Sequence, residues 1–421
     1  MRYEVQWLPM VRNLQCRLCK SNDLIDFLHL GQQSFTGIFP EDKDTRVPHG
    51  DLTLQRCEVC TLVQLAHTYD KSIMYGMNYG YRSSLNDSMK LHLQEISRFI
   101  KESVTFKSGD VIVDIGSNDG TFLSFFEGKD LIRIGVDPTI KKFSSSYSAE
   151  ITTIPDFFNR DVYSSASNKP AKFISSISMM YDLDDPIGFA SDVADCLDKE
   201  GAWFFEQSYL GLMIEKLAYD TICHEHLEYY SAETIKRILE QVGLVVRDMK
   251  LNSVNGGSIA VLAVKKSNRL AGHCKEFLEL LHRERITGLN TGEKLVKFRK
   301  EVEEHRQQLK SQIEEFISSG KRVAALGAST KGNVLLQYCD LDSTKISFIG
   351  DVNRDKFGCV TPGTLIPIIQ ESEVFERAPD VILILPWHFQ ETFLRKTSSF
   401  IDKGGIVVFP LPKIQVLQKL I

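Results

Sequence analysis

The sequence has no strong excess of charge of either sign and no long apolar run. Its 50 lysines and arginines against 55 aspartates and glutamates give a net charge of −5 and a pI of about 6.1. Nucleic acids and anionic membranes attract strongly basic surfaces, so we expect neither as a partner. Nowhere do about 18 apolar residues run together, and the first residues lack the apolar core of a signal peptide. We therefore expect a cytoplasmic protein, either a monomer or a weak homodimer.

Three common ligand-binding signatures are missing. A dinucleotide fingerprint would have glycines where this chain has Asn118 and Thr121, so NAD is disfavoured. The glycine-rich stretch around Lys331 lacks the G-x-x-x-x-G-K-[ST] spacing of a P-loop. The H-E-H segment at 224–226 is not H-E-x-x-H, and on a helix its two histidines would point to different sides. These absences exclude the common NAD, P-loop and helical zinc-protease arrangements.

Nine cysteines include two C-x-x-C pairs with 37 residues between them, a pattern that suits a reducing compartment better than a disulfide framework. Two such knuckles can each present two thiolates to one tetrahedral zinc. Four sulfur ligands leave no open position, so the metal should be structural and supply folding energy to a segment of about 70 residues. A redox C-x-x-C is the alternative for either pair alone. We expect His29, His49 and His67 to be surface or packed residues, and the ligands to be Cys16, Cys19, Cys57 and Cys60.

A strand signal followed by a glycine turn marks the middle of the chain. The apolar run from Val111 ends near Asp114, and Gly116 and Gly120 then allow the backbone to approach a ligand closely. Strand, acid and G-x-N-x-G, with Asn118 as the third residue of the turn, resembles motif I of class I S-adenosylmethionine (SAM) methyltransferases. The next strand ends in Asp137, whose carboxylate can accept both ribose hydroxyls. The alternative is a core strand with an ordinary loop.

Strands and helices alternate from residue 107 to about 265, which predicts a doubly wound sheet with its ligand at the carboxyl ends of the strands. Asp156 with Phe157 follows one short strand and can face an adenine, or can be a helix cap and a core residue. Ser178 follows the fourth strand, where a methyltransferase places cofactor-facing residues. An amphipathic helix is predicted over 86–106. The expected strands are 111–115, 132–136, 151–154, 173–179, 202–206 and 258–264.

Two further segments carry groups suited to a polar substrate. Tyr79 and Tyr81 lie in a stretch dense in tyrosine and glycine, where phenols can donate hydrogen bonds or simply cover a domain junction. In an extended segment, His224 and His226 would share a face, with Glu225 between them. Imidazole titrates near neutral pH and a carboxylate can hold its tautomer, so this segment can supply a general base. The alternative is a buried polar cluster that ties a loop to the sheet.

The C-terminal part begins with a charged helical stretch from 266 to about 320, which we expect to bridge domains. A second α/β unit follows, with strands at 322–326, 346–349, 381–385 and 406–409 and a helix at 334–338. Its first turn offers Ser329, Lys331 and Asn333 as a phosphate cradle at a helix N-terminus. Apolar residues recur on the bridging helices at Phe277, Leu278, Leu280, Leu281, Leu295, Val296, Phe298, Val302, Leu309, Ile313 and Phe316.

Taken in order, these motifs resemble one family over nearly the whole chain. C-x-x-C twice, D-I-G-S-N-D-G, Y-D-T-I-x-H-E-H-x-x-Y-Y-S, N-G-G-S, G-A-S-x-K-G-N and T-P-G-T are similar to the sugar C-methyltransferases that act on nucleotide-linked 4-keto deoxysugars. The resemblance implies a zinc-binding domain at 1–75, a SAM-binding methyltransferase domain at 76–265, and a helical bridge with a Rossmann-like substrate-nucleotide domain at 266–421. The expected partner is a nucleotide sugar, and the expected cofactors are SAM and structural Zn²⁺.

The resemblance also implies a reaction. A 4-ketone acidifies the neighbouring C–H, a base removes that proton, and the resulting enolate carbon takes the methyl group from SAM. The base corresponds to His226, with Glu225 beside it. Relatives commonly have tyrosine where this chain has Cys223, and a thiol cannot donate a comparable hydrogen bond to the keto oxygen. The stretch 178–186 also differs from relatives. An O- or N-methyltransferase and a non-catalytic scaffold are the alternatives.

Overall fold

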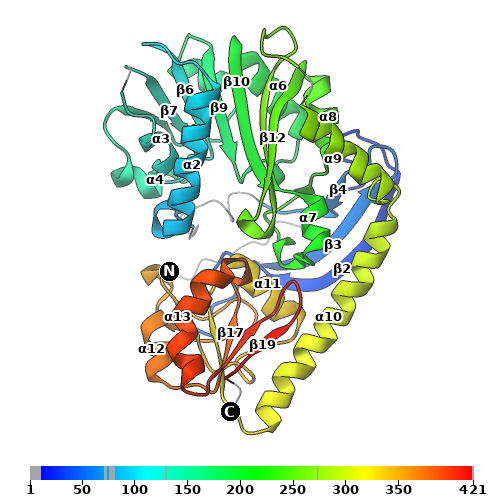
Figure 1. Cartoon of the computed structure of the whole chain (residues 1–421), viewed down its shortest axis with the longest axis vertical. Coiled ribbons are helices and arrows are strands. Elements are labelled where there is room, and N and C mark those ends of the chain that lie inside the picture. The colour runs from blue at the N-terminus through cyan, green and yellow to red at the C-terminus, as the bar shows by residue number, and fades with distance from the viewer. Residues whose placement is uncertain (1–10, 71–73, 75–80, 129, 273, 420–421) are drawn as a thin grey trace.

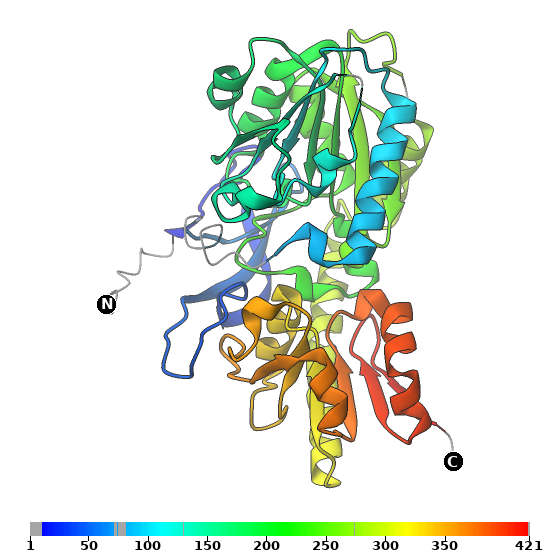
Figure 2. The same cartoon turned by 90° about the vertical axis from the view of Figure 1, so that its left-hand side faces the viewer.

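The computed structural model describes residues 11–70, 74, 81–128, 130–272 and 274–419, which form four sheets, the helices that cover them and one long helix, α10. Figure 1 shows the central sheet above the C-terminal sheet, with helix α10 running down one side of both. Strands β2 and β3 of the N-terminal sheet extend alongside the two larger units in both views (Figures 1 and 2). Within the described ranges, no helix is long and apolar enough to cross a membrane.

The N-terminal sheet is small, antiparallel and completed by residues from much later in the chain. Its strand order is β11-β4-β3-β2, and β11 pairs with β4 so that Glu228 lies opposite Gln64 and Tyr229 opposite Val63. A separate two-stranded ribbon joins β1 to β5. The strands are β1 (Val11–Arg12), β2 (Leu24–Ser34), β3 (His49–Cys57), β4 (Val63–Leu65), β5 (His67–Thr68) and β11 (Glu228–Tyr229).

The central sheet has seven strands in the order β12-β13-β10-β9-β6-β7-β8. All are parallel except β13, which is antiparallel to both neighbours. The predicted doubly wound sheet is confirmed. The apolar pattern did not predict β12, because charged residues interrupt this edge strand. The strands are β6 (Val111–Ile115), β7 (Ile132–Val136), β8 (Ile151–Ile154), β9 (Ala171–Ile177), β10 (Leu197–Ser208), β12 (Leu244–Asn252) and β13 (Ser258–Lys265).

Helices cover both faces of the central sheet because alternate strand residues point to opposite sides. Ile112 belongs to the buried cluster that includes α2 on one face, and Val113 belongs to the cluster that includes α6, α8 and α9 on the other. The predicted amphipathic helix is α2, which begins after the Asn86 cap. The helices are α2 (Asp87–Ser103), α3 (Thr121–Ser124), α4 (Ile140–Phe143), α5 (Arg160–Ala166), α6 (Pro186–Cys196), α7 (Leu210–Glu215), α8 (Ala232–Gln241) and α9 (Lys275–Ile286). Short 3-10 turns are η1 (Ser83–Leu85), η2 (Ser144–Ser146), η3 (Met180–Asp182), η4 (Tyr219–Thr221) and η5 (Val254–Gly256).

The C-terminal sheet has the order β16-β15-β14-β17-β18-β19 and is parallel except for β19. The expected second α/β unit is therefore present, although the strand predicted at 346–349 begins only at Ile349. The strands are β14 (Val323–Leu326), β15 (Ile349–Asp351), β16 (Ile368–Gln370), β17 (Val381–Ile384), β18 (Ile406–Phe409) and β19 (Gln415–Leu417). The helices are α11 (Thr330–Tyr338), α12 (Glu371–Glu376) and α13 (Gln390–Asp402), with η6 (Arg354–Lys356) and η7 (Trp387–Phe389).

Helix α10 (Glu293–Ser318) is the predicted bridge between the two larger units. Its buried face runs from Leu295 to Phe316 and packs into the core that includes the C-terminal sheet. Two of the predicted apolar positions are wrong, because Leu278 is 50% exposed and Val296 is 58% exposed. Each follows a buried residue directly, and one step along an α-helix turns the side chain about 100° away from that face.

A buried carboxylate fixes the start of α8. Glu284, on α9, accepts hydrogen bonds from the backbone N–H groups of Ala232 at 2.6 Å and Glu233 at 3.1 Å. The Tyr209 hydroxyl, at the end of β10, donates to the same carboxylate at 2.8 Å. A negative charge at a helix N-terminus satisfies its free N–H groups and interacts favourably with the helix dipole. Glu284 therefore joins the helix that follows β11 to the central sheet.

We predict that Glu284→Ala lowers the free energy of unfolding by about 2 to 3 kcal/mol, because it leaves two amides and a phenol buried without their acceptor. Urea unfolding followed by circular dichroism measures this loss. Glu279→Ala is the matched control: it lies on the same helix and forms only an exposed pair with Lys275. That change should cost about 0.5 kcal/mol or less. Equal losses in the two variants would contradict the prediction.

Candidate functional site

The four cysteines of the two C-x-x-C pairs come together as predicted. Their sulfur atoms all lie within 4.8 Å of one another, with 3.4 Å between Cys16 and Cys60 and 3.5 Å between Cys19 and Cys57. A tetrahedral zinc with Zn–S bonds of about 2.3 Å needs sulfurs about 3.8 Å apart, so this cluster fits the metal. His29, His49 and His67 do not belong to it. With four thiolates the coordination is complete, and the zinc is structural.

The two knuckles have the same backbone turn. The Cys16 carbonyl accepts from the N–H of Lys20 at 2.9 Å, and the Cys57 carbonyl accepts from the N–H of Thr61 at 3.0 Å. Both residues at the end of the turn have positive φ, 59° and 67°. This conformation is uncommon outside glycine and asparagine, and it persists where surrounding structure determines it. The repeated turn supports one metal held symmetrically by two knuckles.

The glycine turn follows β6 at the carboxyl edge of the central sheet. Gly116 and Gly120 have φ of 73° and 78°, and Asn118 has φ of 50°. A Cβ on Gly120 would lie 2.9 Å from the Tyr147 ring, so glycine is needed there for packing as well as for conformation. The Asn118 amide reaches back to the loop before α2, where Nδ2 donates to the Tyr81 carbonyl at 3.1 Å and Oδ1 accepts from the Ser83 N–H at 3.0 Å.

Asp137 follows β7 and is already engaged within the protein. Its Oδ2 accepts from the Asn118 N–H at 2.8 Å. Its Oδ1 accepts from the N–H and the hydroxyl of Thr139 at 2.6 and 2.5 Å. Oδ1 therefore has no further lone pair for a ribose hydroxyl, and the two-oxygen contact expected from the sequence is not available in this conformation. Oδ2 keeps one acceptor position and also supports the glycine turn.

Asp114, on β6, is a buried acid that accepts from the Ser175 hydroxyl of β9 at 2.7 Å. Burial raises the pKa of this carboxyl to about 7, and the neighbouring Asp137 adds to the rise while the Ser175 hydrogen bond opposes it. Two acids on adjacent parallel strands suit a ligand that carries positive charge, and the open position on Asp137 Oδ2 suits a single hydroxyl, which are features of SAM. The residues therefore fit the cofactor. Ser175 was missed because an isolated serine within a strand carries no sequence signal.

Asp156 and Ser178 follow two strands of the central sheet, β8 and β9, that are separated by β6 and β7. Asp156 follows β8 and is exposed, and α5 is capped by Asn159, so Asp156 is not that helix cap. Phe157 is 46% exposed and is not a core residue, which leaves the adenine-facing interpretation as a prediction. Ser178 follows β9 with φ of 55°, and its hydroxyl accepts from Asn255 Nδ2 at 3.3 Å. Asn255 connects this edge to the C-terminal domain.

The H-E-H segment forms a turn, in which the His226 N–H donates to the Cys223 carbonyl at 3.2 Å. The expectation that both histidines share a face is therefore wrong. His224 is fully buried between the rings of Phe35 at 4.5 Å and Tyr69 at 4.9 Å, and its Nε2 donates to the Gly50 carbonyl at 3.2 Å. Burial lowers its pKa to about 4. His224 ties the segment to the N-terminal domain.

His226 faces the other way. Its Nδ1–H donates to the Thr221 carbonyl at 2.7 Å, and its ring centroid lies 4.2 Å from that of Tyr181. The carbonyl can only accept, so it holds the imidazole in the tautomer whose Nε2 carries a lone pair. Burial lowers the pKa of His226 to about 3, and the positive charge of Lys331 adds to this effect. A backbone carbonyl, and not the expected Glu225 carboxylate, orients the ring.

Glu225 points toward the N-terminal domain, where a Cβ on Gly37 would lie 3.0 Å from its Oε1. Burial raises its pKa, and the Cys223 thiol opposes that rise by donating a hydrogen bond. Cys223 is fully buried, so the thiol that replaces the expected tyrosine is directed at this carboxyl. Cys223 and Glu225 therefore lie beside His226, and neither of them contacts its Nδ1 atom.

The C-terminal domain contributes a cation. Lys331 Nζ donates to the Asn255 carbonyl at 2.5 Å, and loss of hydration lowers its pKa while the charge of Asp220 opposes that shift. Asp220 is buried and accepts from Trp387 Nε1 at 2.8 Å. Neither Asp220 nor Trp387 was predicted, because the contact joins residues 167 positions apart. Lys331 is thus placed beside His226 and the end of β9.

The other predicted substrate residues have different surroundings. Ser329 caps α11, since its hydroxyl accepts from the Gly332 N–H at 3.0 Å, so this N–H is already paired and the predicted phosphate cradle stays a prediction. Asn333 is fully buried and its Nδ2 donates to the Thr36 carbonyl at 2.9 Å, so it joins the C-terminal and N-terminal domains. Tyr81 is partly exposed beside the glycine turn. Tyr79 lies outside the described residues.

Three family models match consecutive parts of the chain. Residues 16–75 match a zinc binding domain, residues 87–248 a methyltransferase domain, and residues 253–412 a C-methyltransferase C-terminal domain. The first contains the four cysteines, the second contains the glycine turn and the H-E-H segment, and the third contains Asn255 and Lys331. Zinc and SAM are accordingly the metal and the cofactor of this chain.

C-methyltransferase NovU of Streptomyces niveus is 28% identical over 412 residues, which cover 96% of this chain and 96% of NovU. Among solved structures, magnesium protoporphyrin IX methyltransferase ChlM from Synechocystis PCC 6803 with bound SAH is 12% identical, with a TM-score of 0.33 over 43% of this chain and 88% of ChlM. A SAM dependent methyltransferase from Aquifex aeolicus is 15% identical, with a TM-score of 0.31 over 43% of this chain and 94% of that one. The assignment of zinc and SAM to this chain rests on the family models and on NovU.

We predict one zinc per chain, retained by the four thiolates. Cys57→Ser with Cys60→Ser removes half of the ligands and should abolish stoichiometric zinc and unfold the N-terminal domain, because structural zinc supplies folding energy. Elemental analysis of purified protein measures the metal. Cys359→Ser, far from the cluster in sequence, is the control and should keep its zinc. A full complement of zinc in the double variant would refute the site.

We also predict that Asp137→Ala weakens SAM binding by roughly 2 to 4 kcal/mol, the order expected when a charged acceptor is lost from a buried site. Calorimetry measures the affinity. Part of the loss should come from the released Asn118 N–H, so Asp137→Asn, which keeps an acceptor oxygen, should lose less. Half-buried Asp110, at the opposite, amino end of β6, provides a control as Asp110→Ala. Unchanged affinity in Asp137→Ala would mean that the ribose is held elsewhere.

Proposed function

Because the chain is a SAM-dependent methyltransferase with the domain order of the C-methyltransferases, we propose that it methylates a carbon next to the ketone of a nucleotide-linked 4-keto-6-deoxy sugar. The proposed position is C3. The motifs from the glycine turn to G-A-S-x-K-G-N are similar to those of sugar C-methyltransferases, and NovU supports transfer to carbon. The reaction then proceeds through an enolate generated by a base of this chain.

The tautomer of His226 is the observation that carries this proposal. Its Nδ1–H is committed to the Thr221 carbonyl at 2.7 Å, which leaves Nε2 as an acceptor. A general base needs such a free lone pair within hydrogen-bond reach of the proton that it removes. Tyr181 packs on the ring at 4.2 Å and restricts its rotation. The imidazole is therefore orientated before the substrate arrives.

Proton transfer follows from this arrangement. His226 Nε2 takes the proton from the carbon beside the ketone, and the electrons of the broken C–H bond form the enolate. SAM, when bound, would supply the methyl group: the enolate carbon would form the new C–C bond as the methyl–sulfur bond breaks, and the sulfur would keep that electron pair and become a neutral thioether. The imidazolium keeps its Nδ1–H bond to Thr221, which stabilises the positive charge. Loss of that proton to solvent restores the base.

Lys331 has two effects in this scheme. Its charge helps to lower the pKa of His226 to about 3 in the free protein, which makes the imidazole a weak base. A nucleotide sugar brings a negatively charged diphosphate, and pairing that charge with Lys331 opposes the part of the pKa shift of His226 that Lys331 causes. Substrate binding then makes His226 a stronger base than it is in the free protein. Ser329, at the N-terminus of α11, offers further polar contacts to the same phosphates.

An O- or N-methyltransferase on the same scaffold remains the second candidate, since it needs a base but no ketone. Only C-methylation labilises a carbon-bound proton, so solvent deuterium exchange separates the two. We further propose that the enzyme acts in the cytoplasm as a monomer or weak homodimer, with a small-molecule substrate and without nucleic acid. Screening SAM turnover on a panel of nucleotide-linked 4-keto sugars identifies the nucleotide and the sugar.

We predict that His226→Ala lowers turnover by about 10² to 10⁴, the usual effect of removing a general base. Its SAM affinity should hardly change, because the glycine turn lies on other strands. Mass spectrometry of deuterium uptake into the keto sugar, without SAM, measures proton removal directly.

Exposed His282 on α9 gives the control variant His282→Ala, which should exchange at the wild-type rate. His224→Ala is informative as well, because it should disturb the contact to Gly50 and reduce stability more than exchange. Wild-type exchange by His226→Ala, together with its loss in His224→Ala, would identify His224 as the base.

A further inference from the structure

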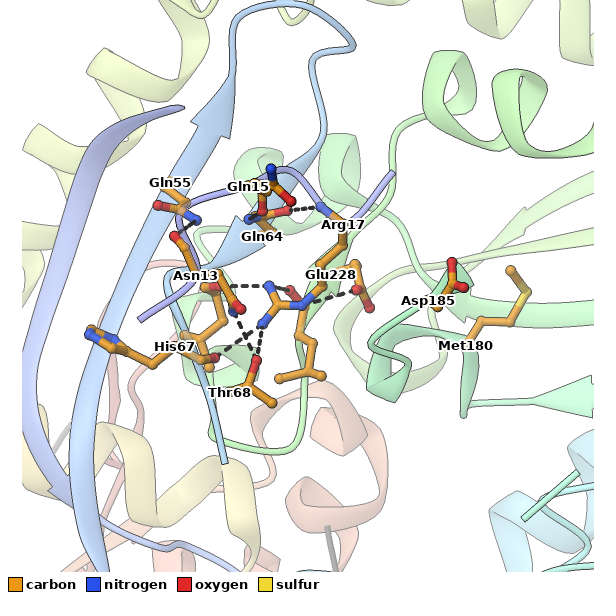
Figure 3. Close-up of polar contacts among 12 residues, drawn as sticks. Asn13, Gln15, Arg17, Gln55, Gln64, His67, Thr68, Met180, Asp185 and Glu228 are labelled. Atoms are coloured by element: carbon orange, nitrogen blue, oxygen red, sulfur yellow. Dashed lines mark hydrogen bonds and ion pairs between the residues drawn. The ribbon is translucent and has the colours of Figure 1, made fainter. Parts of the chain in front are cut away.

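An arginine inside the first zinc knuckle is buried against the segment that carries His226. Arg17 lies between Cys16 and Cys19 and is only 5% exposed (Figure 3). Arginine is rarely buried unless its guanidinium is paired, because desolvation of the charge is costly. The zinc ligands alone do not require an arginine at this position. The contacts of its side chain therefore need a separate explanation.

The guanidinium joins two parts of the chain that are far apart in sequence. On the N-terminal domain, Nη1 donates to the Leu65 carbonyl at 2.7 Å, and Nη2 donates to the His67 carbonyl at 3.2 Å and the Thr68 hydroxyl at 2.9 Å. On the other side, Nε forms an ion pair with Glu228 at 3.5 Å, and Nη1 lies 3.5 Å from the Leu227 carbonyl. Figure 3 shows these contacts converging on the one side chain.

The knuckle backbone is held in register with the same segment. Gln64, on β4, accepts from the Arg17 N–H at 2.8 Å and donates to the Gln15 carbonyl at 3.2 Å, so it grips both neighbours of Cys16. Across the strand pair, Gln64 lies opposite Glu228. The first knuckle, β4 and β11 therefore form one connected polar unit around Arg17.

Leu227 and Glu228 are the two residues directly after His226. The Leu227 carbonyl accepts from the Leu65 N–H at 2.8 Å, and the Leu227 N–H donates to the Tyr181 carbonyl at 2.6 Å. Tyr181 is also the residue whose ring packs on His226. A displacement of Leu227 moves the α-carbon of His226 and the ring that restrains it. Catalytic groups misplaced by about 1 Å can lose 10²-fold in rate.

We propose that Arg17 is a positioning residue, which holds the 226–228 segment against the zinc knuckle so that the His226 imidazole keeps its orientation. This inference rests on the proposed function of His226 as the base. Arg17 has no part in proton transfer itself. The N-terminal zinc domain thereby acts on the reaction through a single buried side chain and does not merely stabilise the fold.

Arg17→Met tests this inference, because methionine fills much of the volume but makes none of the five polar contacts. We expect zinc content of one per chain and SAM affinity within about two-fold of the wild type. The probe is the keto sugar whose carbon-bound proton the wild type exchanges fastest. In Arg17→Met, the exchange rate of that proton should fall about 10- to 100-fold. In protein labelled with ¹⁵N-histidine, the His226 resonances should change from the Nδ1–H tautomer to a mixture of tautomers. His226→Ala identifies those resonances.

Arg12→Met is the matched control. Arg12 is in the same domain, but its side chain pairs with Asp26 on β2, the edge of the sheet opposite β11. It should leave the exchange rate and the His226 resonances unchanged. Glu228→Gln acts from the other side of the ion pair and leaves both knuckles intact. It should shift the same resonances, and its effect should largely disappear in the Arg17→Met background, since coupled residues are not additive.

The outcomes are distinct. Wild-type exchange and wild-type His226 resonances in zinc-loaded Arg17→Met would overturn the inference. If Arg17→Met loses its zinc, Glu228→Gln tests the inference instead. Unchanged His226 resonances in Glu228→Gln would then overturn the inference. If the wild type exchanges no carbon-bound proton in any keto sugar, the proposed function fails, and the tautomer of His226 still decides whether Arg17 positions it.

Discussion

The pairing of β11 with β4 is the constraint on which the arrangement of the site depends. Two residues, Glu228 and Tyr229, leave the methyltransferase domain and complete the sheet of the zinc domain. The H-E-H turn directly precedes this strand, so its place is set by two domains at once. His224 packs into the zinc domain and His226 turns toward the carboxyl edge of the central sheet. Without this strand pair the turn would be an ordinary surface loop.

Electrostatics at the junction are governed by burial. Asp114, Asp220, Glu225, His226 and Lys331 all have pKa values shifted toward their uncharged forms. Loss of hydration is the main cause in each case, because a charge is poorly stabilised away from water. A cation bound beside the carboxyl groups and an anion bound beside Lys331 would oppose these shifts, because each stabilises the charged form of its neighbour. The site is therefore suited to ligands of both signs, bound beside each other.

Local signals predicted the parts of the fold that depend on local sequence. Apolar runs bounded by turns identified β6, β7, β8 and β18 almost to the residue. The C-x-x-C spacing predicted the metal ligands because two short knuckles need only one long-range contact to form the site. By contrast, β12 and β19 were missed, since edge strands tolerate charged and polar residues on their open side.

The details of the candidate site depend on contacts between distant segments, which a single sequence does not reveal. The turn at 224–225 separates the two histidines, and its cause is the pairing of the following residues with β4. Thr139 occupies one oxygen of Asp137, and Asn333 is committed to Thr36. Arg17 carried no sequence signal beyond its place between two cysteines. In each case the residue type was visible, but its partner lay elsewhere in the chain.

The contacts of the zinc domain with both larger units have a mechanical consequence. β4 holds the methyltransferase domain through β11, and the end of β2 holds the C-terminal domain through Ser34 and Gln337 at 2.7 Å. Helix α10 connects the same two units along a separate path (Figure 1). Each of the three domains is thus joined to the other two, like the corners of a triangular frame. Bending at one junction alone cannot separate any two of them. Rotation of the large domains would have to strain the small one, so the distance between the central and C-terminal sheets is held by the whole frame.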